Sequence, residues 1–295
     1  MKEVINAFTA QFDYPADARC ALAEGYERLC ADPEASALFH SYVDAYERDE
    51  FRDYDGALTA LEGLDCGVHA YTLQLLLFIC FSRRLRERYR EAGIDEQIWY
   101  DSMCDLKWKL RECWRMYGIW GSFVARWFPG FFTMSRFALG RFQYETIRMG
   151  ETYTYGDKTV GAEDTVLNFH IPSCGPITPE SRMDSYRRAE TFYRDLFPDG
   201  ITVLTCHSWL LFPAHREMLP PDSNIVGFMN DFQLLHAEED PGYHDFWRVF
   251  YRAYSPDMPA ETTLQRAYLA RRNSGLPGGA GRGVILLQNG EILNR

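Results

Sequence analysis

In the first 130 residues, apolar positions recur at steps of three and four, the spacing of helices with one buried face. The stretch 70 to 81, "AYTLQLLLFICF", is apolar on all sides. It falls short of the roughly 20 residues that a membrane span requires and contains Thr72 and Gln74, so it predicts a buried helix. We therefore expect a helical N-terminal domain over residues 1–134. One clear helical face lies between 99 and 117 and consists of Trp99, Met103, Leu106, Leu110, Cys113, Trp114 and Tyr117.

The helix from 66 to 92 ends in a basic stretch, "RRLRERYREAG". Basic side chains in a last turn suit the negative end of the helix dipole, and Gly93 suits a helix stop. We interpret these arginines as a solvated face, with a phosphate-binding patch as the alternative.

After "WFPG" at 127 to 130 the pattern changes to short strands alternating with helices. This order predicts a second domain over 135–295, a mixed α/β sheet flanked by helices. The glycine-rich "SGLPGGAGRG" at 274 to 283 has no following Lys-Ser/Thr and no helix, so it is not a P-loop, and we expect a flexible connection. The predicted strands are 141–149, 165–171, 201–212, 232–238 and 283–288, and the predicted helices are 179–197, 244–253 and 260–273.

Composition limits the possible partners. The chain has 295 residues, of which 42 are acidic and 31 basic, giving a net charge of -11 that disfavours a nucleic-acid partner. The first 20 residues carry acidic and polar groups where an export signal would be apolar, so we expect a cytoplasmic protein with no membrane partner. Eight cysteines without a C-x-x-C pair indicate free thiols. The acidic stretch "HAEEDPGYHD" at 236 to 245 has no spacing of a tight metal site, so no metal is expected.

The stretch 165 to 193 reads as a strand, a tight loop "PSCGP" and a strongly capped helix. Thr178 suits the N-cap, Pro179 the first helical position and Glu180 the first turn. The unpaired N–H groups and the dipole of such a helix end attract anions, and a diphosphate is a common occupant. An ordinary crossover that binds nothing is the alternative.

Four segments in this half carry a resemblance: "LGRFQYE" at 139, "HIPSCGPIT" at 170, "CHSWLLFP" at 206 and "LPPDSNIVGF" at 219. They resemble a bacterial family of acyltransferase-domain proteins that joins a helical N-terminal N-acyltransferase domain to a C-terminal domain similar to the GNAT acetyltransferases. The match is clearest over about 120 to 235. The resemblance implies an α+β or α/β fold with a GNAT-like mixed sheet, and acyl-CoA or acetyl-CoA as the co-substrate.

The resemblance also implies where acyl-CoA would lie. The pantetheine arm would pair with the backbone of Asn168 to Ile171, and the diphosphate would lie near Ser173, Cys174, Gly175 and Thr178. The loop "SCGPIT" departs from the usual one, an Arg or Gln followed by spaced glycines, because it has a single glycine.

Acyl transfer to an amine needs a base for the ammonium proton, amide donors for the oxyanion, and an acid for the departing thiolate. His170, at a strand end and on its polar face, is the first candidate for the base, and Glu145 on the neighbouring strand is the second. Ser208 or Ser223 are the candidates for the acid, since the tyrosine that GNAT enzymes use is absent after the strand at 201 to 212.

We expect direct transfer of an acyl group from acyl-CoA to an amine or hydroxyl of a small-molecule or peptide acceptor. One alternative is a GNAT-like binding or regulatory module without catalysis, which the missing tyrosine and the short loop would explain. A second is a cysteine-dependent acyl hydrolase or transferase, with Cys206 as the nucleophile and His170 as its base. No feature of the sequence indicates an oligomeric state.

Overall fold

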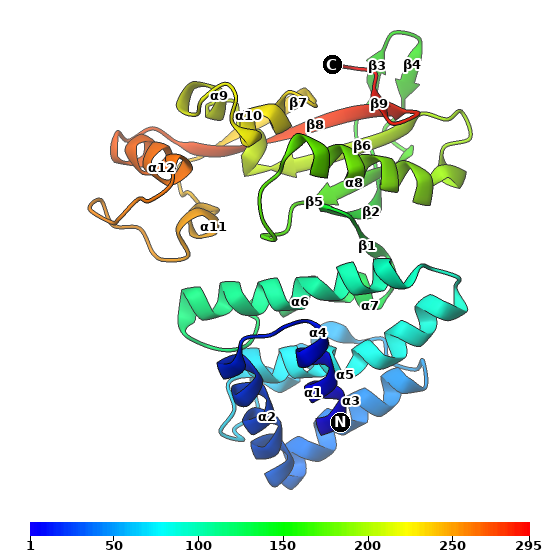
Figure 1. Ribbon diagram of the computed structural model, residues 1–295, viewed down its shortest axis with the longest axis vertical. Coiled ribbons are helices and arrows are strands. Elements are labelled where there is room, and N and C mark those ends of the chain that lie inside the picture. Colours follow the sequence, from blue (N-terminus) through cyan, green and yellow to red (C-terminus); the bar gives the residue numbers. More distant parts are fainter. The chain divides into compact units, whose positions relative to one another are not determined.

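The computed structural model describes residues 1–295, which divide by internal contacts into two compact units, Met1–Phe137 and Ala138–Arg295. The boundary expected from the sequence, after residue 134, lies three residues before this division. Helices make up the first unit, and a sheet with helices makes up the second (Figure 1). No helix of the protein has both the length and the apolar character that crossing a bilayer requires.

The N-terminal unit is built around the 22-residue helix α5 (Ala70–Glu91). Its residues 72 to 82 are all buried, and α1, α2, α3, α4 and α6 pack against it, which confirms the predicted buried helix. Asp32 and Asp53 accept hydrogen bonds from the first backbone N–H groups of α3 and α4 and so fix where these helices begin. The other elements are α1 (Lys2–Gln11), α2 (Ala16–Ala31), α3 (Pro33–Glu47), α4 (Tyr54–Glu62), α6 (Glu96–Tyr117), the 3-10 helix η1 (Ala125–Trp127) and α7 (Pro129–Phe132).

The arginines at the end of α5 pair with acidic side chains of the same unit. Arg84 contacts Asp49 at 2.6 Å and Glu91 at 2.7 Å, and Arg83 contacts Glu47 at 3.0 Å. Arg86 also pairs with an acidic residue, the glutamate at the start of α6. Arg83, Arg84 and Arg86 thus form the solvated, charge-paired face that the sequence favoured over a phosphate patch.

A seven-stranded mixed sheet forms the centre of the C-terminal unit, in the order β1-β2-β5-β6-β8-β7 with β9 beside β8. β2 pairs with β5, and β8 pairs with β6, β7 and β9, in antiparallel orientation, whereas β5 and β6 are parallel. The predicted mixed sheet with flanking helices is confirmed. The strands are β1 (Arg136–Leu139), β2 (Phe142–Arg148), β5 (Thr165–His170), β6 (Thr202–Ser208), β7 (Gln233–Asp240), β8 (Gly278–Gln288) and β9 (Glu291–Ile292), and β3 (Tyr153–Tyr155) pairs with β4 (Lys158–Val160) as a separate ribbon.

Helix α8 (Pro179–Phe192) covers one face of the sheet, packing against β2 and β8 (Figure 1). Tyr186 of this helix stacks on Phe142, and the Ser185 hydroxyl accepts from the Phe142 N–H and donates to the Leu139 carbonyl. These contacts hold α8 against the β1–β2 turn. The remaining helices are η2 (Arg194–Leu196), η3 (Trp209–Leu211), α9 (His215–Met218), α10 (Asn224–Met229), α11 (Phe246–Phe250) and α12 (Thr263–Asn273).

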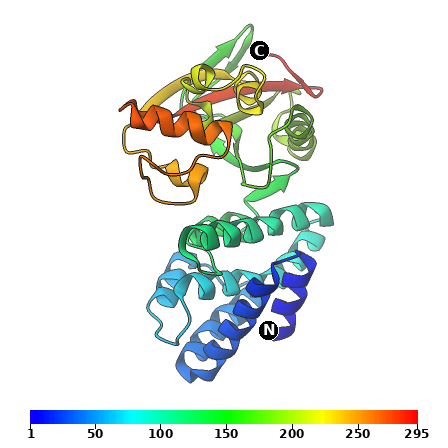
Figure 2. The ribbon, with the colours of Figure 1, turned by 60° about the vertical axis from the view of Figure 1, so that its left-hand side comes forward.

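The segment from 241 to 277 carries a small core of its own, in which α11 and α12 lie side by side (Figure 2). Tyr243, Phe246, Phe250 and Tyr268 are its buried aromatic residues. The helices predicted here are present but shorter than expected, since 244–253 reduces to Phe246–Phe250.

Three expectations are wrong. The predicted strand 201–212 ends at Ser208, where the 3-10 helix η3 follows. On the helical face between 99 and 117, which the apolar spacing predicts to be buried, Trp114 and Tyr117 are 43% and 50% exposed.

The third wrong expectation concerns the glycine-rich stretch. The glycine-rich stretch is not a flexible connection, because Gly278 onward is the first half of strand β8. A Cβ at Gly281 would lie 2.5 Å from the Leu211 carbonyl oxygen, and one at Gly283 would lie 2.7 Å from the Phe232 ring. The glycines therefore let other elements approach the strand closely, which is a packing requirement that local sequence does not reveal.

Candidate functional site

Strands β2 and β5 gather four polar side chains on one face of the sheet. The antiparallel register pairs Gln143 with His170 and Glu145 with Asn168. Since successive residues point to opposite faces, these four share one face, while Tyr144 and its neighbours point to the other. The sequence predicted that His170 lies on the polar face of its strand and Glu145 on the neighbouring strand, and the register adds which polar residues meet.

His170 and Glu145 form the central pair of this face. The His170 Nε2 and the Glu145 Oε1 are 2.7 Å apart, and the Asn168 Nδ2 lies 3.1 Å from the same His170 nitrogen and 3.5 Å from Glu145 Oε1. An ionised carboxylate only accepts, so the neutral imidazole that faces it carries its proton on Nε2 and donates it to Glu145, and the Asn168 amide nitrogen, also a donor, bonds to the same carboxylate oxygen and not to the imidazole. This tautomer leaves Nδ1 as the basic nitrogen of the ring. About a quarter of each side chain is exposed, 27% for His170 and 21% for Glu145, so a substrate can reach the pair.

The parallel strands β5 and β6 remain paired over only two residue pairs, Leu167 with Leu204 and Asn168 with Thr205. β5 continues to His170 and β6 to Ser208, but the ladder between β5 and β6 does not extend to these ends. The backbone of β5 therefore leaves its β6 partner at the residues where the strand runs into the loop. A strand edge of this kind offers N–H and C=O groups to an extended ligand.

The loop from 171 to 178 is held by one side chain, Arg141, from the turn between β1 and β2. Its guanidinium donates to three loop carbonyls: Nη1 to Pro172 at 2.9 Å, Nη2 to Gly175 at 2.7 Å, and Nε to Pro176 at 3.2 Å. Burial lowers the pKa of Arg141 from its usual value. Gly175 has a φ of 120°, a conformation open only to glycine, so this one glycine sets the turn.

Helix α8 begins where the sequence predicted. The Thr178 hydroxyl accepts from the Ser181 N–H at 3.2 Å, and Pro179 is the first helical residue, which confirms the predicted cap. The pKa of Glu180 is lowered by hydrogen bonds from its own backbone N–H and from Thr178. An acidic group is thus already stabilised at this helix end, as expected at the positive end of a helix dipole.

Of the candidate acids, Ser208 lies beside the site and Ser223 caps a helix, and the candidate nucleophile Cys206 is buried. Ser208 lies at the diverging end of β6, where its hydroxyl oxygen accepts from the Leu210 N–H at 3.2 Å. Ser223 caps α10 by accepting from the Val226 N–H at 3.3 Å. Cys206 is buried, and burial raises the pKa of its thiol well above the usual value, the opposite of what a nucleophilic thiolate needs.

The acidic stretch 236 to 245 distributes its side chains over separate partners. His236 lies 3.7 Å from Glu151, and His244 lies 2.8 Å from Asp240. The protein contains no group of three or more metal-ligand side chains arranged to hold an ion.

Sequence reasoning did not assign a role to Arg141, although it lies in the quoted "LGRFQYE". The available signal was an arginine directly before a strand whose antiparallel partner leads into the candidate loop. That arrangement brings the side chain to the loop, but only once the pairing of β2 with β5 is known.

Comparisons with known proteins agree with this architecture. Three solved structures resemble the chain over most of its length: an acyltransferase in complex with decanoyl-CoA (TM-score 0.71, 22% identity, 94% of this chain and 86% of that one), an acyltransferase mutant with octanoyl-CoA (0.70, 20%, 97% and 88%), and an acyltransferase with decanoyl-CoA and teicoplanin (0.69, 20%, 95% and 86%). No curated protein matches the chain.

Family models cover nearly the whole chain. Residues 4–134 match an N-acyltransferase N-terminal domain, and residues 137–285 match a GNAT-like C-terminal domain. The resemblance noted from the four sequence segments is thereby confirmed. The chain belongs to the family that joins an N-acyltransferase N-terminal domain to a GNAT-like C-terminal domain.

Proposed function

We propose that the protein is an acyl-CoA-dependent acyltransferase that transfers a medium-length acyl chain directly to an amine of a small-molecule acceptor. The separation of β5 from β6 beside the N-terminus of α8 is the observation that carries this proposal. Family membership supports acyl transfer. The structural neighbours, which hold decanoyl-CoA and octanoyl-CoA, support the chain length, and the neighbour that holds teicoplanin supports a small-molecule acceptor.

In this proposal the backbone of Asn168 to Ile171 pairs with the pantetheine arm along the edge that β6 has left. The diphosphate lies near Ser173, Cys174, Gly175 and Thr178, at the positive end of the α8 dipole. Three carbonyls of this loop accept hydrogen bonds from Arg141, which brings one positive charge to the loop that would bind the diphosphate. The loop has one glycine where the usual loop has several, and the hydrogen bonds from Arg141 fix its conformation.

His170 is the proposed base. Its Nδ1 takes the proton from the acceptor ammonium, and Glu145 stabilises the imidazolium that forms, through the 2.7 Å hydrogen bond at Nε2. The amine nitrogen then attacks the thioester carbon, a C–N bond forms, and the C–S bond breaks. Backbone N–H groups of β5 stabilise the oxyanion. Ser208 is the proposed relay for the second proton of the acceptor nitrogen: its O–H donates to the CoA thiolate while its oxygen takes that proton, so CoA leaves as the thiol and the hydroxyl is restored.

The first test measures ligand binding through the shift in melting temperature. A ligand at about 100 times its dissociation constant stabilises the folded state by roughly 2.7 kcal/mol, which corresponds to a shift of a few degrees. We expect decanoyl-CoA and octanoyl-CoA to shift the melting temperature more than acetyl-CoA, and adenosine diphosphate to shift it least. No shift with any acyl-CoA would exclude the proposed co-substrate.

The second test separates catalysis from binding alone. His170→Gln should lower turnover by about 10²- to 10⁴-fold, the usual contribution of a general base, while leaving the affinity for CoA unchanged. The matched control is His207→Gln, because His207 is an exposed histidine of β6 that pairs only with Glu238, at 3.1 Å. Acyl-CoA binding without turnover by the wild-type protein toward any amine would instead indicate the non-catalytic module.

A further inference from the structure

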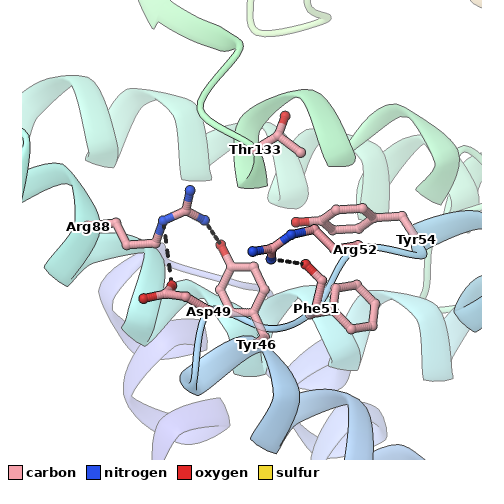
Figure 3. A pocket seen from close by; sticks show the side chains of 7 residues that line it. All are labelled: Tyr46, Asp49, Phe51, Arg52, Tyr54, Arg88 and Thr133. Carbon is pink, nitrogen blue, oxygen red and sulfur yellow. Dashed lines mark hydrogen bonds and ion pairs between the residues drawn. The ribbon is translucent and has the colours of Figure 1, made fainter.

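A second candidate binding site lies within the N-terminal unit. A cavity of about 340 Å³ opens between the chain that connects α3 to α4, helix α5 and the end of α7. This volume lies at the lower end of the range for small-molecule pockets, roughly 300–1,000 Å³. Its lining residues, shown in Figure 3, are Tyr46, Asp49, Phe51, Arg52, Tyr54, Arg88 and Thr133.

Two guanidinium groups reach into this cavity from opposite sides (Figure 3). Arg88 is held by its Nη1, which donates to the Phe132 carbonyl at 2.9 Å and to the Tyr46 hydroxyl at 3.3 Å. Arg52 is held by its Nη1, which donates to the Phe51 carbonyl at 2.7 Å. A guanidinium has five N–H groups, so each arginine is anchored at one nitrogen and keeps the N–H groups of its Nη2 for a ligand.

The one acidic side chain of the lining does not neutralise both arginines. Both carboxylate oxygens of Asp49 accept from Arg84, Oδ2 at 2.6 Å and Oδ1 at 3.3 Å. Its contact with Arg88 is much longer, 3.9 Å. The hydrogen bonds from Arg84 hold the pKa of Asp49 below its usual value, so the lining carries two positive charges and one negative charge.

Tyr54 adds a neutral donor and an aromatic wall. Its hydroxyl points toward the two guanidinium groups (Figure 3). Burial raises the pKa of Tyr54 to about 12, so the hydroxyl keeps its proton at neutral pH. The ring meets Phe51 edge to face, with centroids 4.9 Å apart and an interplanar angle of 90°, which fixes its position.

We propose that this cavity binds a small organic oxyanion, a carboxylate or a phosphomonoester, with the charged group between Arg52 and Arg88 and its apolar body against Phe51 and Tyr54. The lining carries two guanidinium groups against one carboxylate, which suits an anion and not a cation. Planar guanidinium groups match two oxygens of a carboxylate or phosphate at once. The cavity is lined only by residues of the N-terminal unit and shares none with the proposed acyl-CoA site.

Isothermal titration calorimetry with three probes tests the proposal: benzoate, phenyl phosphate and the neutral isostere benzamide. We expect saturable binding of benzoate or phenyl phosphate, and affinity at least about tenfold lower for benzamide, because charged hydrogen bonds are about twice as strong as neutral ones. The tighter of the two anions identifies the natural headgroup as a carboxylate or a phosphate.

The informative variant is Arg52→Gln, because Arg52 is exposed and its one internal hydrogen bond is to the neighbouring carbonyl. It should weaken anion binding at least about tenfold. The matched control is Arg48→Gln, since Arg48 is also exposed in the same connection but pairs with Glu50 at 2.8 Å and does not line the cavity. Tyr54→Phe, which keeps the ring and removes the donor, should weaken binding by a smaller factor.

Three results would overturn the proposal: no saturable binding of either anion, equal affinity for benzamide, or the same affinity in Arg52→Gln as in Arg48→Gln. The last would mean that the anion binds elsewhere, including at the diphosphate site proposed for acyl-CoA. If the wild-type protein did not bind acyl-CoA, these titrations would be unaffected, so each proposal can be refuted without the other.

Discussion

Acidification should destabilise the C-terminal unit through His215. This side chain is completely buried, and its Nδ1 lies 3.0 Å from the Phe212 carbonyl oxygen. A carbonyl only accepts, so Nδ1 carries the proton of the neutral ring and Nε2 is left without one. No partner is present for Nε2, and the ring is stacked on Tyr268 and meets Trp209 edge to face. A second proton would therefore create a buried charge with nothing to accept its hydrogen bond.

The magnitude follows from the pKa. Burial lowers the pKa of His215 from 6.5 to about 4, the Phe212 carbonyl opposes this shift, and the positive charge of Arg271 on α12 adds to it. Between these two pKa values the unfolded chain binds more protons than the folded one, so the contribution of His215 to stability is complete above pH 6.5 and decreases as the pH falls. At about pH 4 the loss amounts to about 3 kcal/mol.

Urea unfolding of wild type and His215→Phe, at about pH 7.5 and about pH 4, measures this loss. Phenylalanine keeps the ring contacts and removes the titration, and the Phe212 carbonyl still accepts from the backbone N–H of residue 215 at 3.0 Å. Other groups also titrate in this range, and they do so equally in both proteins. Wild type should therefore lose about 3 kcal/mol more than the variant. An equal loss in both would refute the assignment of the low pKa to His215.

Three other changes give distinct expected outcomes. Arg141→Gln should raise the dissociation constant for CoA about tenfold or more, because the loop from 172 to 176 loses charged hydrogen bonds of which each contributes about 1.5–3 kcal/mol. Titration of this variant and of the control Arg148→Gln, at the far end of β2, checks this, and equal affinities would contradict it. Gly281→Ala should destabilise by about 1–3 kcal/mol, as overpacking does, and an unchanged unfolding midpoint would argue against the close contact with Leu211. Cys206→Ala should leave turnover within about twofold under direct transfer, whereas a thiol nucleophile would require its loss.

Local patterns predicted a large part of the fold. The steps of three and four located the helices of the N-terminal unit, and the alternation of apolar and polar residues located β2 and β5 and their faces. Thr178 and Pro179 located the start of α8 to the residue. Each of these signals acts within a few residues, which is the range over which capping and periodicity operate.

The parts that could not be predicted depend on contacts between distant segments. Glu145 meets His170 because of a strand register that no local rule sets. The carbonyls that Arg141 holds lie 31 to 35 residues further along the chain. The cavity between Arg52 and Arg88 combines the connection after α3 with residues of α5 and the end of α7, and none of these segments has a motif of its own.

The first half of β8 has a consequence for how variants of this protein should be made. Gly279, Gly281 and Gly283 point to one face, and the space that their side chains would fill is occupied by other parts of the chain. Their neighbours Ala280 and Arg282 point to the other face and are partly exposed. A mutagenesis library directed at this stretch should therefore keep every second codon fixed and vary those between, because a segment with the composition of a spacer is here one of the least replaceable of the protein.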